Sequence, residues 1–192
     1  MPRDRSARKA AAVTPAGQRP FTTSRGVVVT LKPYSGLAQS ADEEAVRQSW
    51  LAEGRALPAK PTYTLTAAGG VVETHEHDLL TIKGNAEAEA AWAKWQADEA
   101  AFQQAVSEVT VRGFILDYME FAIDPAWSAK ARAKRVAIPA DPYEAKVYFG
   151  LTEVLATRGD VFEAFALASE LAGVTGPQLE AAREAFRGAV GQ

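Results

Sequence analysis

The feature of the sequence that most constrains the fold is a stretch of strong helix formers that begins after Asn85. Alanine, glutamate, lysine and glutamine dominate residues 86–108, and all four have high helix propensity. The large apolar residues of this stretch recur with a 3-then-4 spacing, which places them on one side of a helix. They are Trp92, Trp95, Phe102 and Val106. We therefore expect a long amphipathic helix, capped by Asn85, whose apolar face is covered either by the protein's own core or by a partner.

The same stripe continues past the stretch of helix formers, through Phe114, Leu116, Met119 and Ile123. Val109-Thr110-Val111 and Gly113 have lower helix propensity than the residues before them. We expect the element to bend or to split there.

Helix-capping patterns recur in the rest of the chain. Ser40 and Glu43 form a capping-box pattern, which predicts a helix over residues 41–53. Asp124-Pro125 and Asp141-Pro142 each place a capping carboxylate before a first-turn proline, so a helix is expected after each pair.

The last third of the chain predicts three short helices joined by short connections. The first covers residues 142–157, and the second covers residues 161–172 with Asp160 as its cap. The third begins at a capping-box pattern formed by Thr175 and Gln178. Short connections favour an antiparallel arrangement of such helices.

Extended segments are few and short. The β-branched run within residues 26–32 predicts one strand, and residues 62–66 and 71–77 predict a hairpin around Gly69-Gly70. The predicted fold is mainly α with a small β-hairpin (α+β), a helical bundle with a short N-terminal strand and the hairpin. We expect a disordered basic arm over residues 1–25, a strand, helix and linker over residues 26–60, and a hairpin plus helical domain over residues 61–192.

The N-terminal arm differs in charge from the rest of the chain. Residues 1–25 contain six basic residues and one acidic residue, a balance of +5, which leaves −8 for the remainder of a chain of net charge −3. A flexible basic arm can bind nucleic acid through phosphate contacts, although a solvated tail is the simpler interpretation. An arginine-rich, acid-poor N-terminus is also typical of transit peptides, but no amphipathic stripe supports that interpretation here.

The residues needed for most kinds of chemistry are missing. The chain has no cysteine, which excludes thiolate metal sites and cysteine nucleophiles. The only two histidines, His75 and His77, stand close together on the predicted hairpin, so no other histidine is available as a base for a serine nucleophile. No glycine-rich phosphate-binding loop precedes a helix. We therefore expect a protein that is not an enzyme and needs no cofactor.

The pair of histidines is a weak metal-site candidate. Residues i and i+2 of a strand share a face, so both imidazoles can approach one ion, with Glu73 or Asp78 nearby. A zinc site needs three or four ligands, and the chain has no third histidine to complete it. An exposed polar face of a hairpin is the alternative, and we expect no metal.

A basic run offers a second candidate surface, formed by Lys130, Arg132, Lys134 and Arg135. Such a run on a short helix can bind nucleic acid or an acidic partner. Most runs of this kind are simply solvated, and no aromatic residue alternates with these charges as on single-strand binding surfaces.

The apolar runs are too short for a membrane span, which needs about 20 residues, and the N-terminus lacks the apolar segment of a secretory signal. We therefore expect a cytoplasmic protein with no membrane partner. An oligomer remains open.

Several strings in the sequence together resemble a known family. They are Pro61-Thr62-Tyr63-Thr64, Gly69-Gly70-Val71, Thr74-His75-Glu76-His77-Asp78 and Ala91-Trp92-Ala93-Lys94-Trp95-Gln96, with the alanine-rich stretch from Leu171 to Arg187. In spacing and composition they resemble small proteins encoded among the tail genes of long-tailed bacteriophages, the tail assembly chaperones. The basic arm and residues 124–139 lie outside the resemblance.

The resemblance implies a noncatalytic protein in the host cytoplasm that coats the long, helical tape-measure protein until tail-tube subunits polymerise around it. Partner-binding residues would then be Trp92, Trp95, Phe102 and Val106, because an apolar stripe suits an amphipathic helix. Two alternatives stay open, namely a structural tail or connector subunit of the virion and a nucleic-acid-binding regulator that uses the basic arm.

Overall fold

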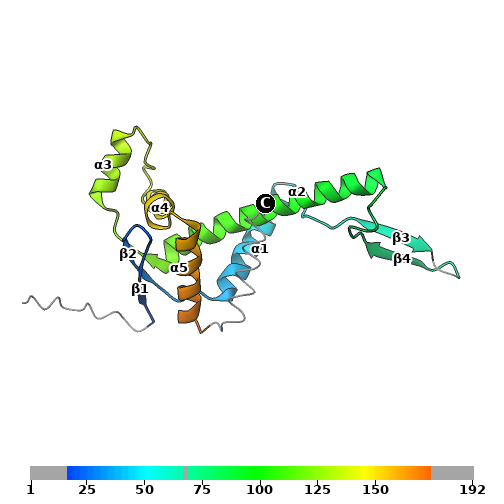
Figure 1. Ribbon diagram of the computed structural model, residues 1–192, viewed down its shortest axis with the longest axis horizontal. Helices are drawn as coiled ribbons and strands as arrows, with labels where there is room; N and C mark the ends of the chain where they lie inside the picture. Colours follow the sequence, from blue (N-terminus) through cyan, green and yellow to red (C-terminus); the bar gives the residue numbers. More distant parts are fainter. Residues whose placement is uncertain (1–16, 67–68, 174–192) are drawn as a thin grey trace, which may run out of the picture. The chain divides into compact units, whose positions relative to one another are not determined.

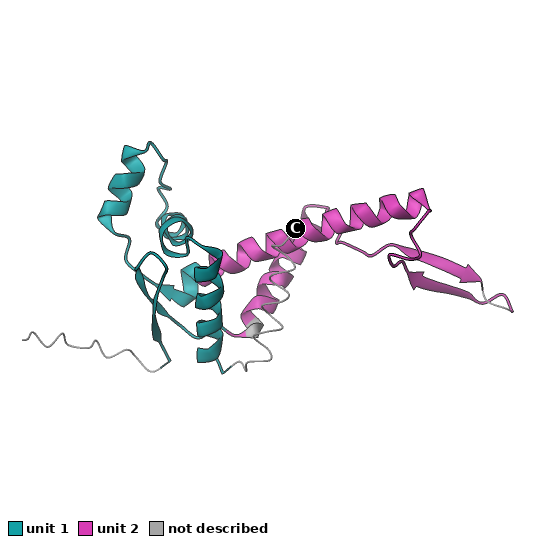
Figure 2. Cartoon of the chain, viewed as in Figure 1, with its two compact units in different colours: residues 1–34, 115–175 teal, residues 35–114, 176–192 magenta. Residues whose placement is uncertain are grey.

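A computed structural model describes residues 17–66 and 69–173. Over these residues the protein has five α-helices and short antiparallel strands in two small sheets (Figure 1), which confirms the predicted α+β class. The chain forms two units (Figure 2): unit 1 contains residues 1–34 and 115–175, and unit 2 contains residues 35–114 and 176–192. These boundaries differ from the predicted ones, because two segments distant in sequence build one sheet in unit 1.

The sheet of unit 1 has three antiparallel strands in the order β1 (Arg19–Thr22), β2 (Val28–Leu31) and β5 (Met119–Glu120). Leu31 of the central strand pairs with Arg19 on one side and with Met119 on the other. The inward-facing side chains Val29 and Leu31 are almost completely buried. The prediction of a disordered arm up to residue 25 is therefore wrong for residues 19–22, which are ordered by pairing with β2. Residues 1–16 of the predicted arm lie outside the described residues.

The helices of unit 1 follow the sheet in chain order. Asp124 and Asp141 cap α3 and α4 as predicted. The Asp124 carboxylate accepts from the backbone N–H of Ala126, and the Asp141 carboxylate accepts from those of Tyr143 and Glu144. The predicted helix 142–157 is shorter and changes form, because α4 continues into the π-helical segment η2. The elements are α3 (Pro125–Ala133), α4 (Pro142–Phe149), η2 (Gly150–Val154) and α5 (Arg158–Leu171).

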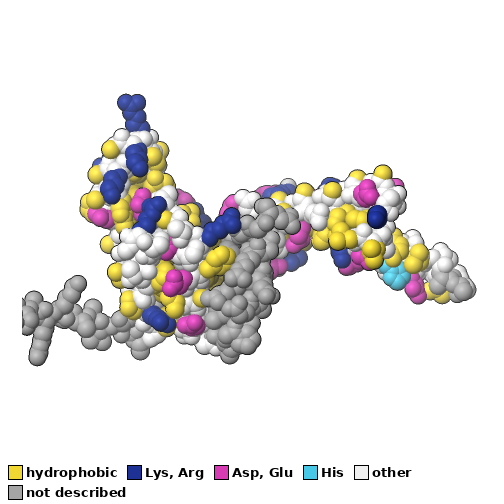
Figure 3. Space-filling model, in the orientation of Figure 1, with side chains coloured by type: hydrophobic (Ala, Val, Ile, Leu, Met, Phe, Trp, Pro, Cys, Tyr) yellow, Lys and Arg dark blue, Asp and Glu magenta, His cyan; other side chains and the backbone are white. Residues whose placement is uncertain are grey.

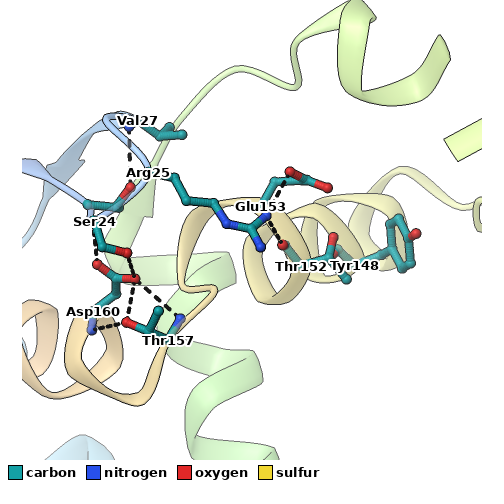
Figure 4. A network of polar contacts seen from close by, with 9 residues as sticks. Ser24, Arg25, Val27, Tyr148, Thr152, Glu153, Thr157 and Asp160 are labelled. Atoms are coloured by element: carbon teal, nitrogen blue, oxygen red, sulfur yellow. Dashed lines mark hydrogen bonds and ion pairs between the residues drawn. The ribbon is translucent and has the colours of Figure 1, made fainter. Parts of the chain in front are cut away.

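The start of α5 differs from the prediction. Thr157, not Asp160, is the N-cap, and Asp160 is the third helical residue of a capping box in which each side chain accepts from the other's backbone N–H. The backbone N–H and hydroxyl of Ser24 also donate to Asp160, at 2.6 and 2.7 Å (Figure 4). Burial by itself raises the pKa of Asp160, but the hydrogen bonds from Ser24 and Thr157 outweigh it and hold that pKa below its ordinary value.

A second contact joins the same β1–β2 turn to the neighbouring helix segment. The guanidinium of Arg25 donates to the carbonyl oxygen of Thr152 at 2.9 Å and pairs with the carboxylate of Glu153 at 3.0 Å (Figure 4). The turn between the first two strands is thus tied to η2 and to the start of α5.

The long helix ends before the predicted stripe does. Helix α2 stops at Gly113, the π-helical segment η1 (Phe114–Tyr118) follows, and the chain then enters β5. The ammonium of Lys146 donates to the carbonyl oxygens of Leu116 and Met119, at 2.8 and 2.9 Å. These bonds satisfy carbonyls that a continuous helix would have paired internally. Burial, with a smaller contribution from Lys32, lowers the pKa of Lys146.

Unit 2 is a pair of helices and a hairpin. Helix α1 packs on the second half of α2, where Trp50 and Phe102 meet edge to face with ring centroids 5.1 Å apart and Val46 and Val106 complete the core. The hairpin is at the other end of α2 (Figure 1). The elements are α1 (Gly36–Ala52), β3 (Thr62–Thr66), β4 (Val72–Glu76) and α2 (Ala86–Gly113).

The capping box predicted at Ser40 and Glu43 is wrong. Helix α1 begins at Gly36 with Ser35 as its N-cap, so both residues lie inside the helix. Glu43 instead pairs with Arg47 one turn later, at 3.3 Å. The prediction at Asn85 is confirmed, because its side chain accepts from the backbone N–H groups of Glu87 and Ala88. The helix predicted from Thr175 onward lies outside the described residues.

Candidate partner-binding surface

The predicted apolar stripe of α2 is divided between two environments. Phe102 and Val106 are buried against α1, and the prediction that they bind a partner is wrong because the protein's own core covers them. Trp92 and Trp95 lie two to three turns earlier, beyond the part of α2 that α1 covers, and both stay partly exposed. The stripe is thus core at one end and surface at the other.

The two tryptophans form a pair of their own. Their ring centroids are 4.8 Å apart, with the rings steeply inclined, and the ammonium of Lys60 lies 5.6 Å from the centroid of the Trp92 ring. The indole Nε1 of Trp92 is buried and has no hydrogen-bond partner among the described residues. An unpaired buried donor of this kind costs free energy.

A hydrogen-bonded turn connects β4 to α2. One carboxylate oxygen of Asp78 accepts from the backbone N–H groups of Leu80 and Thr81, at 2.9 and 2.8 Å. The hydroxyl of Thr81 accepts from the backbone N–H of Asp78 at 2.8 Å. The hydrogen bonds from Thr81 are the main reason that the pKa of Asp78 is lowered. Ile82 is buried at the end of the turn, while Leu79 and Leu80 point outward and are 70% and 83% exposed.

Exposed apolar side chains are frequent in the hairpin and in this turn. Of the eleven large apolar residues that are exposed within the described part of the chain, five fall within residues 65–80, and these are Leu65, Val71, Val72, Leu79 and Leu80. Figure 3 shows hydrophobic side chains gathered where the start of α2 meets the hairpin. We call the hairpin, the turn and the tryptophan pair the apolar surface of unit 2. Clusters of this kind are typical of interaction sites.

Sequence reasoning missed Leu79 and Leu80, because Asp78 was considered only as a metal ligand. The signal was available in the spacing of Asp78 and Thr81, whose short polar side chains stabilise turns by bonding nearby backbone N–H groups. Two leucines between such residues have no strand or helix that could turn them inward.

The two histidines flank Tyr63 on the hairpin. The ring centroid of Tyr63 is 5.7 Å from that of His75 and 4.8 Å from that of His77. His75 contacts the carboxylate of Glu73 at 3.3 Å, and His77 contacts the hydroxyl of Thr81 at 3.3 Å. No group of three or more metal-ligating side chains occurs in residues 17–66 and 69–173. The arrangement is an aromatic face with polar edges.

The basic run lies at the end of α3 in unit 1. Lys130 and Arg132 occupy the last turn, Lys134 is the C-cap and Arg135 follows in a left-handed conformation with φ of 57°. All four side chains are exposed, and Figure 3 shows Lys and Arg side chains over this helix. None of the four forms an ion pair with another residue that the structure describes. Their role as a binding patch stays a prediction.

The helices in the described ranges are all too short or too polar to cross a lipid bilayer. No protein-family model, curated protein sequence or solved structure matches the chain. The candidate surface is therefore interpreted from its own geometry and chemistry.

Proposed function

We propose that the protein is a non-enzymatic assembly chaperone of long-tailed bacteriophages that binds the tape-measure protein and keeps it soluble in the host cytoplasm until the tail is built. The observation that carries this proposal is the number of exposed apolar side chains in the hairpin and turn of unit 2, which precede the partly exposed Trp92 and Trp95 pair along the chain. The resemblance of the same region to tail assembly chaperones agrees with it.

Physical chemistry links this surface to such a role. A long amphipathic helix without its final partner exposes an apolar stripe and aggregates. A chaperone must cover the stripe with apolar side chains of its own, and tryptophan is favoured at the centre of such contacts. The partly exposed pair on α2 and the aliphatic residues before it have this composition.

Coexpression with the tape-measure protein tests the proposal. We expect the wild-type chain to raise the soluble fraction of the tape-measure protein, and Trp92→Ala with Trp95→Ala to remove the effect. Tyr143→Ala is the matched control, because it removes an exposed aromatic side chain from unit 1. Equal protection by the double variant and the wild type would show that the tryptophans serve only the fold.

Mass spectrometry of purified particles separates the chaperone from a structural tail or connector subunit. A chaperone is absent from the mature virion, whereas a structural subunit is present in a fixed ratio. Detection of the protein in mature virions at a fixed ratio would contradict the chaperone proposal and would favour a structural tail or connector subunit.

The exposed basic run on α3 favours a nucleic-acid-binding regulator as a second candidate. Phosphate contacts by Lys130, Arg132, Lys134 and Arg135 would make the affinity fall steeply with salt. A titration with duplex DNA and with RNA at two salt concentrations measures this dependence. Absence of binding at low salt would exclude the candidate.

A further inference from the structure

We propose that the turn at Leu79 and Leu80 is a preformed anchor that binds a basic amphipathic helix. The inference rests on the proposed function, because it specifies the chemistry of the segment that the apolar surface of unit 2 would cover. It adds Leu79 and Leu80, which lie outside the apolar stripe of α2. It also assigns a charge to the partner.

Hydrogen bonds hold the turn at Leu79 and Leu80 in one conformation. The backbone N–H groups of Leu80 and Thr81 are both bonded to the Asp78 carboxylate, and the N–H of Ile82 donates to the carbonyl oxygen of Asp78 at 3.2 Å. The buried side chain of Ile82 fixes the end of the turn. The two leucines are thus held outward by backbone bonds at both sides. A side chain presented on an ordered backbone loses little conformational entropy on binding, which favours affinity.

The two leucines of the turn are exposed to water. Leu79 and Leu80 are the most exposed large apolar residues in the part of the chain that the structure describes. Apolar side chains of this size gain free energy in proportion to the area that a partner removes from water. Two adjacent leucines that stay in water while Ile82 is buried are suited to insertion into an apolar stripe.

The segment that contains the turn is acidic. Residues 60–99, which contain the hairpin, the turn and the start of α2, carry seven acidic residues against three lysines, a balance of −4. Lys60 already pairs with Glu76 at 3.1 Å, and Lys94 pairs with Asp98. Most of the remaining carboxylates, Glu87 and Glu89 among them, are exposed. A segment with this acidic balance attracts a basic partner and repels an acidic one.

An amphipathic helix combines the two properties that this surface requires. Its apolar stripe can receive the leucines and the indole rings, while lysines or arginines on its flanks meet the carboxylates. Strand addition to the open edges of β3 or β4 would use backbone groups and would not depend on Leu79 and Leu80. The leucines therefore distinguish the two modes of binding.

The test uses the full-length protein and two designed peptides. Each peptide is a helix of about 20 residues with the same leucine stripe, and its polar face carries lysines in one peptide and glutamates in the other. Fluorescence anisotropy of labelled peptide measures the affinity at low and high salt. We expect the lysine peptide to bind more tightly than the glutamate peptide, with the difference shrinking as salt screens the charges. Equal binding of the two peptides would overturn the proposed charge.

The variant Leu79→Ser with Leu80→Ser tests the anchor. We expect it to weaken binding of the lysine peptide by about tenfold or more, because both side chains lie at the centre of the contact. Leu51→Ser with Leu151→Ser is the matched control, since it removes two exposed leucines from other elements, and its affinity should equal that of the wild type. Unchanged affinity of the first variant would overturn the anchor.

Sedimentation velocity tests whether a second copy of the chain is the occupant. If the wild type is an oligomer and Leu79→Ser with Leu80→Ser makes it a monomer, the anchor serves self-association and the inference fails.

Coexpression separates this inference from the proposed function. A tape-measure protein that is protected equally by the wild type and by the leucine variant preserves the function and contradicts the anchor, whereas peptide binding without protection contradicts the function alone.

Discussion

The two units of the chain differ in how they bury apolar side chains and how they distribute charge. Unit 1 encloses its core between a three-stranded sheet and helices, and its described residues contain nine basic and nine acidic side chains. In residues 35–114 of unit 2 a core cluster lies between α1 and α2, and the segment contains six basic and twelve acidic side chains. One unit is closed and neutral, and the other is open and acidic.

The difference follows from the number of layers that each unit can stack. A domain needs two packed layers to hide the apolar side of each element, and unit 1 has a sheet with helix α5 against it. In the part of unit 2 that the structure describes, every side chain of β3 and β4 is at least partly exposed. A two-stranded hairpin is marginally stable by itself. A region of this kind is suited to contact with another molecule, whereas unit 1 is suited to being a stable base.

The largest effect is expected in the core cluster between α1 and α2 of unit 2. Phe102→Ala removes the ring that packs on Trp50 and should lower the free energy of unfolding by about 3–5 kcal/mol. Denaturant unfolding followed by circular dichroism measures the loss, and peptide-resolved hydrogen exchange should locate it in α1 and α2. Val109→Ala, at an exposed position of the same helix, should change stability little. Faster hydrogen exchange spread equally over both units would contradict the division of the chain into two units.

The next effect concerns the polar network of unit 1. Asp160→Asn replaces a carboxylate that accepts from Ser24 and Thr157 by an amide that cannot accept from all of these donors. We expect a loss of about 2–3 kcal/mol, with faster hydrogen exchange at the β1–β2 turn. Glu163→Gln in the same helix is the control, because Glu163 is exposed.

The same carboxylate makes the stability of unit 1 depend on pH. Its pKa is lower in the folded state than the ordinary value of 3.8, so its contribution is complete above that value and is lost as the pH falls through the folded pKa. We expect acid unfolding of Asp160→Asn to show a weaker pH dependence in this range than the wild type. Identical slopes in the two proteins would contradict the pKa shift.

A smaller effect is expected where a backbone approaches a side chain closely. A Cβ atom on Gly150 would lie 2.6 Å from Cγ2 of Ile115, a fully buried β-branched residue with little freedom to move. Gly150→Ala should therefore destabilise unit 1 by about 1–2 kcal/mol, although alanine is the better helix former. Gly159→Ala meets only an ordinary contact at 3.6 Å and should be neutral or stabilising. The opposite order of the two variants would refute the packing argument.

The smallest effect is expected at the start of α2. Asn85→Ala removes the side chain that bonds the N–H groups of Glu87 and Ala88, and should cost about 1 kcal/mol. Gln96→Ala, on the exposed face of the same helix, is the control. Faster hydrogen exchange confined to the first turn of α2 would confirm that the cap acts locally.

The sequence predicted the elements whose signals are local. Asn85, Asp124 and Asp141 cap their helices as expected, because a cap depends only on the next three residues. The strands β1 and β5 were missed, since neither has a strand-like pattern and each is defined by its pairing with β2. The break of the long helix at Gly113 agrees with the predicted bend or split, but the path of the chain into β5 was missed, because Lys146 bonds the carbonyls of Leu116 and Met119 from a distant helix. Only tertiary contacts reveal such features.

The candidate surface was also predicted only in part from the sequence. The spacing of Trp92, Trp95, Phe102 and Val106 correctly placed them on one face, but only the position of α1 decides which of them are covered. Nothing in the local pattern distinguishes the two halves of that face. Leu79 and Leu80 were detectable in principle, through the turn-forming residues that flank them.

The pairing of Leu31 with Met119 sets the order in which the chain can fold during synthesis. The ribosome completes all of residues 35–114 before the third strand of the unit 1 sheet exists, so the β1–β2 hairpin must wait for it. The helices α1 and α2 can associate meanwhile, since the residues of the core cluster between them lie within that stretch. Residues 35–114, with their acidic balance, are thus available to a newly made partner before the sheet of unit 1 has closed.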